Sequence, residues 1–358
     1  MHDSTPHAAI IGAGIIGSSI AWRLAQAGCK VTLLDAGSMG GEASWAGAGM
    51  LAPGGEIESR SAWADFAMES LGLYRGFVEE LERDSERTID FQQRGAVEVA
   101  FTPEEWERLQ ARATTQSAIG ISSERLDAAA LRKLIPILDR EFAGALYFPA
   151  DALVDPRDVM SALRSACANR GVQIHEHRHA AAVRWLGQSV EIDTESGMLT
   201  ADCAVIAAGA WSGEIPVWRE EESIATPASF PVKGHLLGYR LEAGSLGPIL
   251  RHAATYVVQR SNGFTIAGSS AERVGFDRGI ADEVVADIHR RACSLLPCLS
   301  KAAPPEPWTG FRPATDSLEP EIRRLPGTAL WLSYGHYRNG ILLAPATAQR
   351  LTREIISS

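Results

Sequence analysis

A glycine-rich run near the start of the chain has the residue types and spacing of a site for a dinucleotide phosphate. Gly12, Gly14 and Gly17 form a G-x-G-x-x-G pattern between an apolar strand and a helical segment that starts near Ile15. The first glycine permits a tight turn, the second lets backbone approach a pyrophosphate, and the third lets helix and strand pack closely. Unpaired N–H groups at the helix N-terminus would then bind the pyrophosphate.

The acidic residue that such a site needs for the ribose follows at the end of the next strand. Residues 30–34 have the pattern of a second apolar strand, and Asp35 ends it. Its carboxylate can accept hydrogen bonds from a ribose hydroxyl. Strand, glycine turn, helix and second strand together predict a dinucleotide-binding βαβ unit.

Two further segments favour FAD over NAD as the dinucleotide. Residues 40–51 are a loop of small residues after Asp35, and backbone without bulky side chains can lie flat against an extended ring system. Residues 335–341 join a loop to a helix N-terminus. The N–H groups there can face an electron-rich acceptor, such as the C2 carbonyl of a reduced flavin.

Two arginines are candidates for holding a substrate carboxylate beside that flavin. Arg312 lies in the segment Gly310–Pro313, and Arg338 lies in the 335–341 loop. A guanidinium can bind a carboxylate through two parallel hydrogen bonds, which the ammonium of lysine cannot match. Amine oxidation by a flavin needs little more from the protein than an oriented, desolvated substrate.

The histidines are weaker signals. His175, His177 and His179 alternate like one face of a strand, but no cysteine or carboxylate cluster accompanies them. We expect an exposed polar strand face there and no metal site. His336 lies beside the expected flavin, and we expect it to orient the loop, because hydride transfer from a neutral amine needs no general base.

Length and composition indicate an ordinary globular enzyme. The 358 residues are 46% hydrophobic with a net charge of −10, which argues against nucleic acid as the main ligand. The five cysteines form no C-x-x-C pair, and no run approaches the roughly 18–20 apolar residues that span a bilayer. The start of the chain lacks the basic segment of a signal peptide. We expect a cytoplasmic protein without a membrane span. The sequence leaves its oligomeric state open, a homo-oligomer included.

The order of the expected elements predicts two domains that are each discontinuous in sequence. Helices are expected over 62–87, from 103, and over 156–170, 281–296 and 341–356. Strands are expected over 95–101, 172–174, 190–192, 203–209 and 330–333, with an Asn-Gly hairpin over 256–268. We assign 1–86, 152–215 and 318–358 to an α/β, Rossmann-like FAD-binding domain, and 87–151 and 216–317 to a largely antiparallel substrate domain.

Six segments, in order along nearly the whole chain, resemble the D-amino acid oxidase superfamily and, within it, the glycine oxidases. They are the N-terminal fingerprint and residues 43–50, 206–212, 231–234, 310–313 and 335–345. The resemblance implies a non-covalent FAD, because residues 308–312 lack the cysteine that tethers flavin in related sarcosine oxidases. With the fingerprint, the expected FAD-binding residues are Gly12, Gly14, Ile15, Ile16, Gly17, Asp35, Ala36, Ala43, Ser44, Ala48, Gly49, Met50, Val183 (adenine side), His336, Tyr337, Arg338, Asn339, Gly340, Ile341 and Leu342.

The resemblance also implies a reaction and the residues that serve it. Arg312 would pair with the substrate carboxylate, Tyr256 would donate a phenolic hydrogen bond to it, and Arg338 would contact the substrate near the flavin. Glycine or a similarly small amino acid would transfer hydride to flavin N5, giving the imino acid and then the 2-oxo acid and ammonia. With oxygen as acceptor the other product is hydrogen peroxide, and in this family glycine oxidation can feed thiazole formation in thiamine biosynthesis.

Two alternatives stay open at this stage. One is an amino acid dehydrogenase that passes electrons to a quinone or a carrier protein. The other is a flavin-binding regulatory or tRNA-modification-associated module.

Departures from the family pattern leave the size of the substrate pocket open. Gln259 stands where proline is usual, Arg323 follows Ile322 where glycine is usual, and Ala271 replaces a larger side chain. Together with Ala254 and Ala267, Ala271 predicts free space beyond a glycine Cα. We therefore expect activity on sarcosine or D-alanine comparable to that on glycine.

Overall fold

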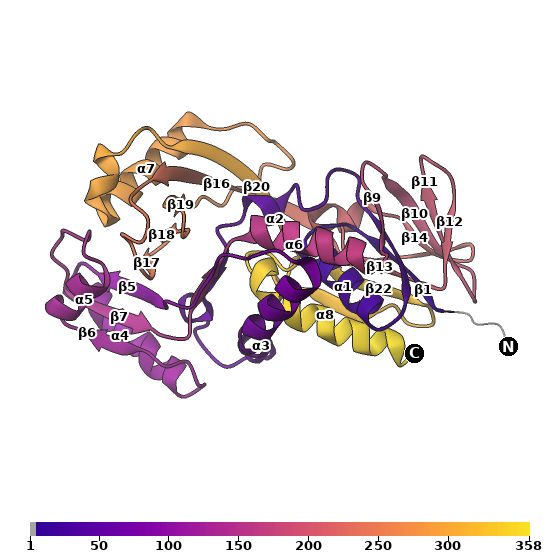
Figure 1. Cartoon of the computed structure of the whole chain (residues 1–358), viewed down its shortest axis with the longest axis horizontal. Helices are drawn as coiled ribbons and strands as arrows, with labels where there is room; N and C mark the ends of the chain where they lie inside the picture. The colour runs from indigo at the N-terminus through magenta and orange to yellow at the C-terminus, as the bar shows by residue number, and fades with distance from the viewer. Residues whose placement is uncertain (1–4) are drawn as a thin grey trace.

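A computed structural model describes residues 5–358 of the chain. Figure 1 shows an elongated molecule with a helix-covered sheet at its centre, a larger sheet unit at one end and a smaller sheet at the other. None of the helices in this range has the length and apolar character needed to cross a membrane.

The central sheet has six strands and contains the predicted βαβ unit. Its order is β21 (Glu321–Arg324), β22 (Leu330–Tyr334), β13 (Cys203–Ile206), β1 (His7–Ile11), β2 (Lys30–Leu34) and β9 (Gln173–His175). All neighbours pair in parallel except β21, which returns antiparallel at the edge. Helix α1 (Ile15–Gln26) joins β1 to β2, so the prediction from the glycine run is confirmed.

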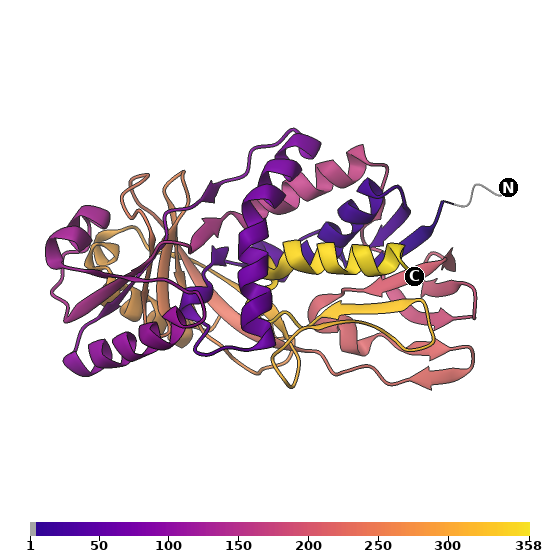
Figure 2. The same cartoon turned by 90° about the horizontal axis from the view of Figure 1, so that it is seen from below.

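Four long helices pack together beside this sheet, as Figure 2 shows from below. They are α1, α3 (Ala62–Ser85), α6 (Pro156–Asn169) and α8 (Gly340–Ile356). Trp22 of α1 meets Phe77 of α3 edge to face, with ring centroids 5.5 Å apart. The side chains of Ser61 and Asp155 cap the starts of α3 and α6 by accepting backbone N–H groups, which fixes where these helices begin.

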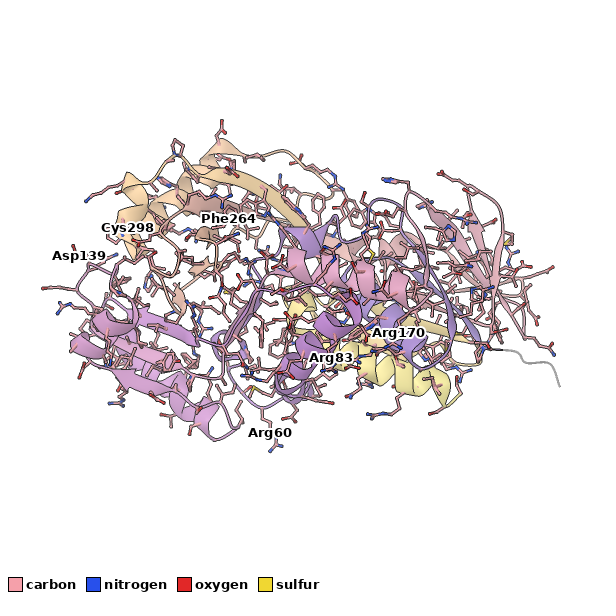
Figure 3. The ribbon with its side chains drawn as sticks, viewed as in Figure 1. Arg60, Arg83, Asp139, Arg170, Phe264 and Cys298 are labelled. Carbon is pink, nitrogen blue, oxygen red and sulfur yellow. The ribbon has the colours of Figure 1, made fainter. Side chains whose placement is uncertain are left out.

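The second large sheet has eight strands and is mostly antiparallel. Its order is β20 (Glu306–Ala314), β16 (Phe230–Arg240), β19 (Phe264–Gly268), β18 (Thr255–Gln259), β17 (Ile249–His252), β5 (Ala96–Ala100), β7 (Gly144–Phe148) and β6 (Glu124–Leu126). Helix α7 (Asp282–Leu295) packs on this sheet, while α4 (Pro103–Ser117) and α5 (Ala128–Leu134) lie beside β5–β7 (Figure 1). Figure 3 places Phe264 on this sheet, where its ring stacks on Trp308 of β20.

Two smaller sheets cross the predicted domain boundaries. One has the order β12 (Leu199–Ala201), β11 (Val190–Thr194), β10 (Ala180–Trp185), β14 (Val217–Arg219) and β15 (Glu222–Ile224). The other has the order β3 (Met50–Leu51), β8 (Ala152–Val154) and β4 (Phe91–Gln92). Because β14 hydrogen-bonds to β10, the five-stranded sheet joins residues on both sides of the boundary predicted after residue 215. Because β4 pairs with β8, the boundaries at 86 and 151 are crossed as well.

Most of the predicted elements are confirmed, and two segments differ. The expected loop around residues 43–50 contains the one-turn helix α2 (Ala43–Ala46). The three alternating histidines do not share a strand face, because β9 ends at His175 and His177 has a φ of 54°. This turn brings the N–H of Arg178 to the carbonyl of Asp35 at 2.7 Å, which joins the turn to the end of β2.

Candidate active site

A cavity of about 590 Å³ is lined by residues from both large sheets. Gly12 and Asp35 line it on the side of the six-stranded sheet, and Tyr256 and Arg312 line it on the side of the eight-stranded sheet. Gly12, Asp35, Tyr256 and Arg312, which come from motifs far apart in sequence, therefore line one continuous space. This is the shape required by an extended dinucleotide that ends beside a small substrate.

Two of the three glycines in the turn, Gly12 and Gly17, are packed too tightly to accept a side chain. A Cβ on Gly12, whose φ is 103°, would lie 2.3 Å from the carbonyl oxygen of Ala207. A Cβ on Gly17 would lie 1.9 Å from the carbonyl oxygen of Gly12, although Gly17 itself does not line the cavity. At Gly14, by contrast, the nearest atom is the Ser44 hydroxyl at 3.4 Å. Gly14 thus leaves backbone open to a phosphate, while Gly12 and Gly17 let strand and helix approach.

Asp35 faces the cavity with both carboxylate oxygens partly engaged. Its Oδ2 accepts the N–H of Ala13 at 2.7 Å, and its Oδ1 accepts the N–H of Gly37 at 2.8 Å. Burial raises the pKa of this carboxyl, and the two backbone N–H groups act in the opposite direction. Each oxygen retains a lone pair, so the group is held in place to accept ribose hydroxyls. Ala36 lines the cavity next to it.

The segment from Ala43 to Met50 lies against the glycine turn. The N–H of Ile15 donates to the Ser44 hydroxyl at 2.9 Å, which occupies one of the free N–H groups at the start of α1. A Cβ on Gly49 would lie 1.9 Å from the carbonyl oxygen of Val154. Gly49 is therefore needed for close packing against Val154. Its expected FAD contacts that line the cavity are Ala43, Ser44, Ala48, Gly49 and Met50, joined by Ile15 and Ile16 of α1.

The loop before α8 brings a second helix N-terminus to the cavity. Residues His336 to Ile341 line it, and the Asn339 side chain donates to Glu56 at 3.0 Å instead of capping the helix. The first N–H groups of α8 are therefore not capped by that side chain and can serve a ligand. Leu342 does not line the cavity within residues 5–358; it is buried among the helices, and its carbonyl accepts the Ser70 hydroxyl at 2.6 Å.

His336 is fully enclosed within this loop. Its Nε2 lies 3.2 Å from the Thr347 hydroxyl on α8. Burial lowers the pKa of His336 to about 3, so the ring stays neutral near pH 7. This contact ties the loop to the helix that follows it.

The residue expected on the adenine side, Val183, does not line the cavity. Val183 is buried in the core between the six- and five-stranded sheets and is absent from the cavity wall formed by residues 5–358. Ala180 and Ala181, at the start of the same strand, line the cavity together with Arg178. Val183 and these two alanines belong to the same strand, β10.

Arg312 occupies a position that a glycine makes available. A Cβ on Gly234, its near neighbour on β16, would lie 2.4 Å from Nη1 of Arg312. The guanidinium donates from Nη1 to the carbonyl of Ser270 and from Nη2 to the hydroxyl of Ser269, both at 2.9 Å. Burial lowers the pKa of Arg312, but an arginine remains charged at neutral pH. Its remaining N–H groups can bind an anion in the cavity.

Tyr256 stands over another glycine. A Cβ on Gly268 would lie 2.3 Å from the Tyr256 hydroxyl oxygen, so only glycine leaves room for the ring there. Burial raises the pKa of Tyr256, and the Arg312 charge partly offsets this shift. The phenol therefore stays protonated and can donate a hydrogen bond. Arg338 also lines the cavity, with its guanidinium 5.3 Å from the ring centroid of Tyr337.

Several cavity-lining residues carried no signal in the sequence analysis. Glu56 and Arg251 line the cavity near the substrate-side residues, and Arg278 and Glu42 form a two-bond ion pair in its wall at 2.7 and 3.1 Å. Glu56, Arg251 and Arg278 lie in segments without a motif, so only the fold reveals them, and Glu42 is the one charged residue of the 40–51 segment. Trp211, also in the wall, stacks on Phe276 with centroids 4.8 Å apart.

Of the three alanines that were expected to enlarge the substrate pocket, one lines the cavity. Ala254 lines the cavity, whereas Ala267 is buried in the core under α7 and Ala271 is outside the cavity wall formed by residues 5–358. The expected space therefore rests on Ala254 alone. Gln259, in place of the usual proline, is buried and bonds to the carbonyl of Glu242 at 3.0 Å. Ile322 and Arg323 lie on the edge strand β21, away from the cavity wall.

These observations fit a bound FAD. The glycine turn and Asp35 suit pyrophosphate and ribose, and the small residues at 43–50 leave room for a flat ring beside the first N–H groups of α8. No cysteine lines the cavity within residues 5–358, and no group of three or more His, Cys, Asp or Glu side chains in this range is arranged to hold a metal.

Fold and site together define a flavin-dependent oxidoreductase. The chain belongs to the FAD dependent oxidoreductase (DAO) family, whose model matches residues 7–354. It is 32% identical to the glycine oxidase of Bacillus subtilis, covering 98% of this chain and 93% of that protein. It is 34% identical to the bifunctional protein ThiO/ThiG of Synechocystis sp., covering 99% of this chain and 52% of that protein.

The solved structures agree with this assignment. The crystal structure of glycine oxidase from Geobacillus kaustophilus has a TM-score of 0.91 at 29% identity, covering 99% of this chain and 96% of that one. The predictions of an α/β flavoenzyme fold and of FAD as cofactor are thereby confirmed.

Proposed function

We propose that this chain is an FAD-dependent oxidase of glycine and similarly small amino acids, and that its FAD is bound non-covalently. The observation that carries the proposal is the placement of Arg312 and Tyr256 on a cavity whose other side fits FAD. The identity to two glycine oxidases, 31% and 32% over nearly the whole chain, supports the substrate class. The 34% identity to the ThiO/ThiG protein supports a role in thiazole formation for thiamine, as the family resemblance implied.

When bound, the flavin accepts a hydride from the substrate α-carbon and passes its electrons to oxygen. The residues of this chain bind and orient the amino acid for that transfer. Arg312, already held by Ser269 and Ser270, binds the carboxylate through its remaining N–H groups. The protonated phenol of Tyr256 donates a further hydrogen bond to it, and Arg338 contacts the substrate from the α8 loop.

No histidine has to act as a base in this scheme. The His336 ring is neutral and bonded to Thr347, and it orients the loop. The amine must arrive without its proton so that its lone pair can assist the departure of the hydride. The L-enantiomer of alanine should fail, because fixing its carboxylate and amine turns the α-hydrogen away from the flavin.

The proposal is tested by assaying the purified yellow protein with glycine, sarcosine, D-alanine and L-alanine, with and without an artificial electron acceptor. Hydrogen peroxide from glycine, sarcosine and D-alanine under oxygen alone is the expected result. Turnover only with the added acceptor would identify a dehydrogenase that serves a quinone or carrier. No turnover under either condition would leave a flavin-binding module and overturn the proposal.

A further inference from the structure

Glu56 is an acid in the cavity wall, at a point where two parts of the site meet. A Cβ on its neighbour Gly55 would lie 2.6 Å from Nη1 of Arg251, which pairs with Tyr256 across β17 and β18. The Glu56 carboxylate accepts the side-chain amide of Asn339, in the loop before α8, at 3.0 Å. Glu56 therefore joins the substrate side of the eight-stranded sheet to the loop expected beside the flavin.

The turn that carries Glu56 is held by a buried side chain. It consists of the short helical turn η1 (Pro53–Gly55) and the residues that follow it. Gln116 of α4 is fully buried, and its amide donates to the carbonyl of Gly54 at 2.8 Å and to that of Ile57 at 2.7 Å. These two bonds lie on either side of Glu56 in the chain, so they fix the backbone from which its side chain projects.

The substrate end of the cavity is rich in hydrogen-bond donors. Arg312, Tyr256 and Arg338 line it, and their N–H and O–H groups suit the carboxylate of an amino acid. The amino group of the same substrate is also a donor, and a donor that is removed from water needs an acceptor. An ammonium group would in addition be repelled by the two arginines unless a negative charge lay near it.

Glu56 is the acid whose charge acts on this end of the cavity. The cavity wall formed by residues 5–358 contains three other acids, which lie on the side of the six-stranded sheet or have an arginine partner: Asp35, Glu214 and Glu42. The side chain of Glu56 is bonded to the uncharged Asn339 and has no ion-pair partner in the same range. Burial raises the pKa of Tyr256, and the Glu56 carboxylate adds to this shift. Burial lowers the pKa of Arg312, and Glu56 acts in the opposite direction, so its charge is within range of both groups.

We propose that Glu56 binds the amino group of the substrate and thereby selects amino acids over simple carboxylic acids. The inference rests on the proposed function: Arg312 holds the substrate carboxylate, and Glu56 accepts N–H groups from the amine. A carboxylate accepts such bonds from the ammonium on arrival and from the neutral amine after the proton has left. The same negative charge repels the substrate carboxylate, so the amino acid binds in one orientation.

Glycine and propionate provide the first test, because propionate has a methyl group in place of the amine. The concentration dependence of anaerobic flavin bleaching gives the dissociation constant of glycine, and calorimetry on the FAD-loaded protein gives that of propionate. Glu56→Gln keeps the size of the side chain and an acceptor for Asn339, but it removes the charge. It should weaken glycine about tenfold, and propionate should bind as in the wild type or more tightly.

Glu58→Gln is the matched control. It makes the same change of charge two residues further along, at an exposed side chain outside the cavity wall formed by residues 5–358, and should change neither constant. Equal losses for glycine and propionate in Glu56→Gln, an unchanged constant for glycine, or the same loss in Glu58→Gln would overturn the assignment of Glu56. If glycine does not bleach the flavin of the wild type, the proposed function fails, and calorimetry with glycine then decides on Glu56 by the same criterion.

A second variant tests whether the turn positions Glu56. Gln116→Met removes both bonds to the turn and keeps the length of the side chain. It should weaken glycine about threefold or more relative to propionate, and it should add nothing in the Glu56→Gln background, because it acts through Glu56. Gln110→Met is the control on the same helix, since the Gln110 amide is bonded to the carbonyl of Trp106 at 3.3 Å. Equal losses from Gln116→Met in both backgrounds would show that Gln116 does not act through Glu56.

Discussion

The phosphate side of the cavity is shaped by backbone and glycines that lie close together in sequence, whereas the substrate side is shaped by side chains from strands far apart. Gly12 and Asp35 belong to one βαβ unit. Tyr256, Arg312 and Arg338 come from β18, β20 and the loop before α8. In both places a glycine makes room, but at Gly12 it admits backbone, and at Gly234 it admits an arginine.

The two sides of the cavity should tolerate amino-acid substitutions to different degrees. Contacts made by backbone N–H groups survive most substitutions that preserve the turn, so the phosphate side can be shared by many enzymes. Contacts made by side chains are lost with one substitution. Substrate choice should therefore vary at the eight-stranded sheet while FAD binding persists.

The largest expected effect is at Arg312. Arg312→Leu should lower kcat/KM for glycine by about 30- to several-thousand-fold, because it removes one partner of a buried charge pair. The flavin spectrum and FAD content should stay normal. Arg312→Lys should recover only part of the activity, because an ammonium lacks the fork geometry. Equal losses for glycine and for a plain primary amine would mean that the carboxylate is held elsewhere, with Arg338 the next residue to test.

A substitution on the phosphate side should weaken FAD binding and leave the oxidation of bound substrate nearly unchanged. Asp35→Ala removes acceptors from the ribose hydroxyls, worth about 1–3 kcal/mol, so the dissociation constant of FAD should rise roughly ten- to hundredfold. The rate at which bound substrate reduces the remaining bound flavin should change little. Titration of the apoprotein with FAD gives the constant, and an unchanged value would show that Asp35 does not contact the ribose.

The same contrast explains what could be predicted from the sequence. The βαβ unit, Asp35 and the start of α8 follow from local spacing, because turns and helix starts depend on neighbouring residues. Arg251 and Glu56 could not be found in this way. The strand of Arg251 is placed by its pairing with β5, which lies far away in sequence, and Glu56 lies in an irregular segment without a motif. Resemblance supplied Arg312 and Tyr256, which line the cavity, and also Val183, which lies in the core of the same strand whose start lines the cavity.

A smaller loss of activity is expected for a substitution of Tyr256. Tyr256→Phe removes one hydrogen bond to a charged group, so kcat/KM for glycine should fall about tenfold. Tyr239→Phe is a matched control, because the Tyr239 hydroxyl contacts His289 at 2.9 Å and the residue lies outside the cavity wall formed by residues 5–358. A similar loss in both variants would point to a general effect on the sheet rather than on the substrate.

The last expected effect concerns stability in acid rather than activity. Burial lowers the pKa of His336 to about 3, whereas an unfolded histidine has a pKa of about 6.5. Between these values only the unfolded chain takes up the proton, so the free energy of unfolding should fall by up to about 1.4 kcal/mol per pH unit as the pH drops below about 6.5. Urea unfolding at several pH values should show a shallower dependence for His336→Gln, and no change for the exposed control His177→Gln. Equal pH dependence of wild type and His336→Gln would contradict the burial of a neutral ring.

The central claim is that one cavity brings an amino acid held by Arg312 to a dissociable FAD. Anaerobic mixing of the purified yellow protein with glycine or sarcosine measures it directly. We predict that the flavin absorbance bleaches, returns when oxygen is admitted with release of hydrogen peroxide, and appears in the supernatant as free FAD after denaturation. No bleaching with any small amino acid, or flavin that stays with the precipitated chain, would contradict the account.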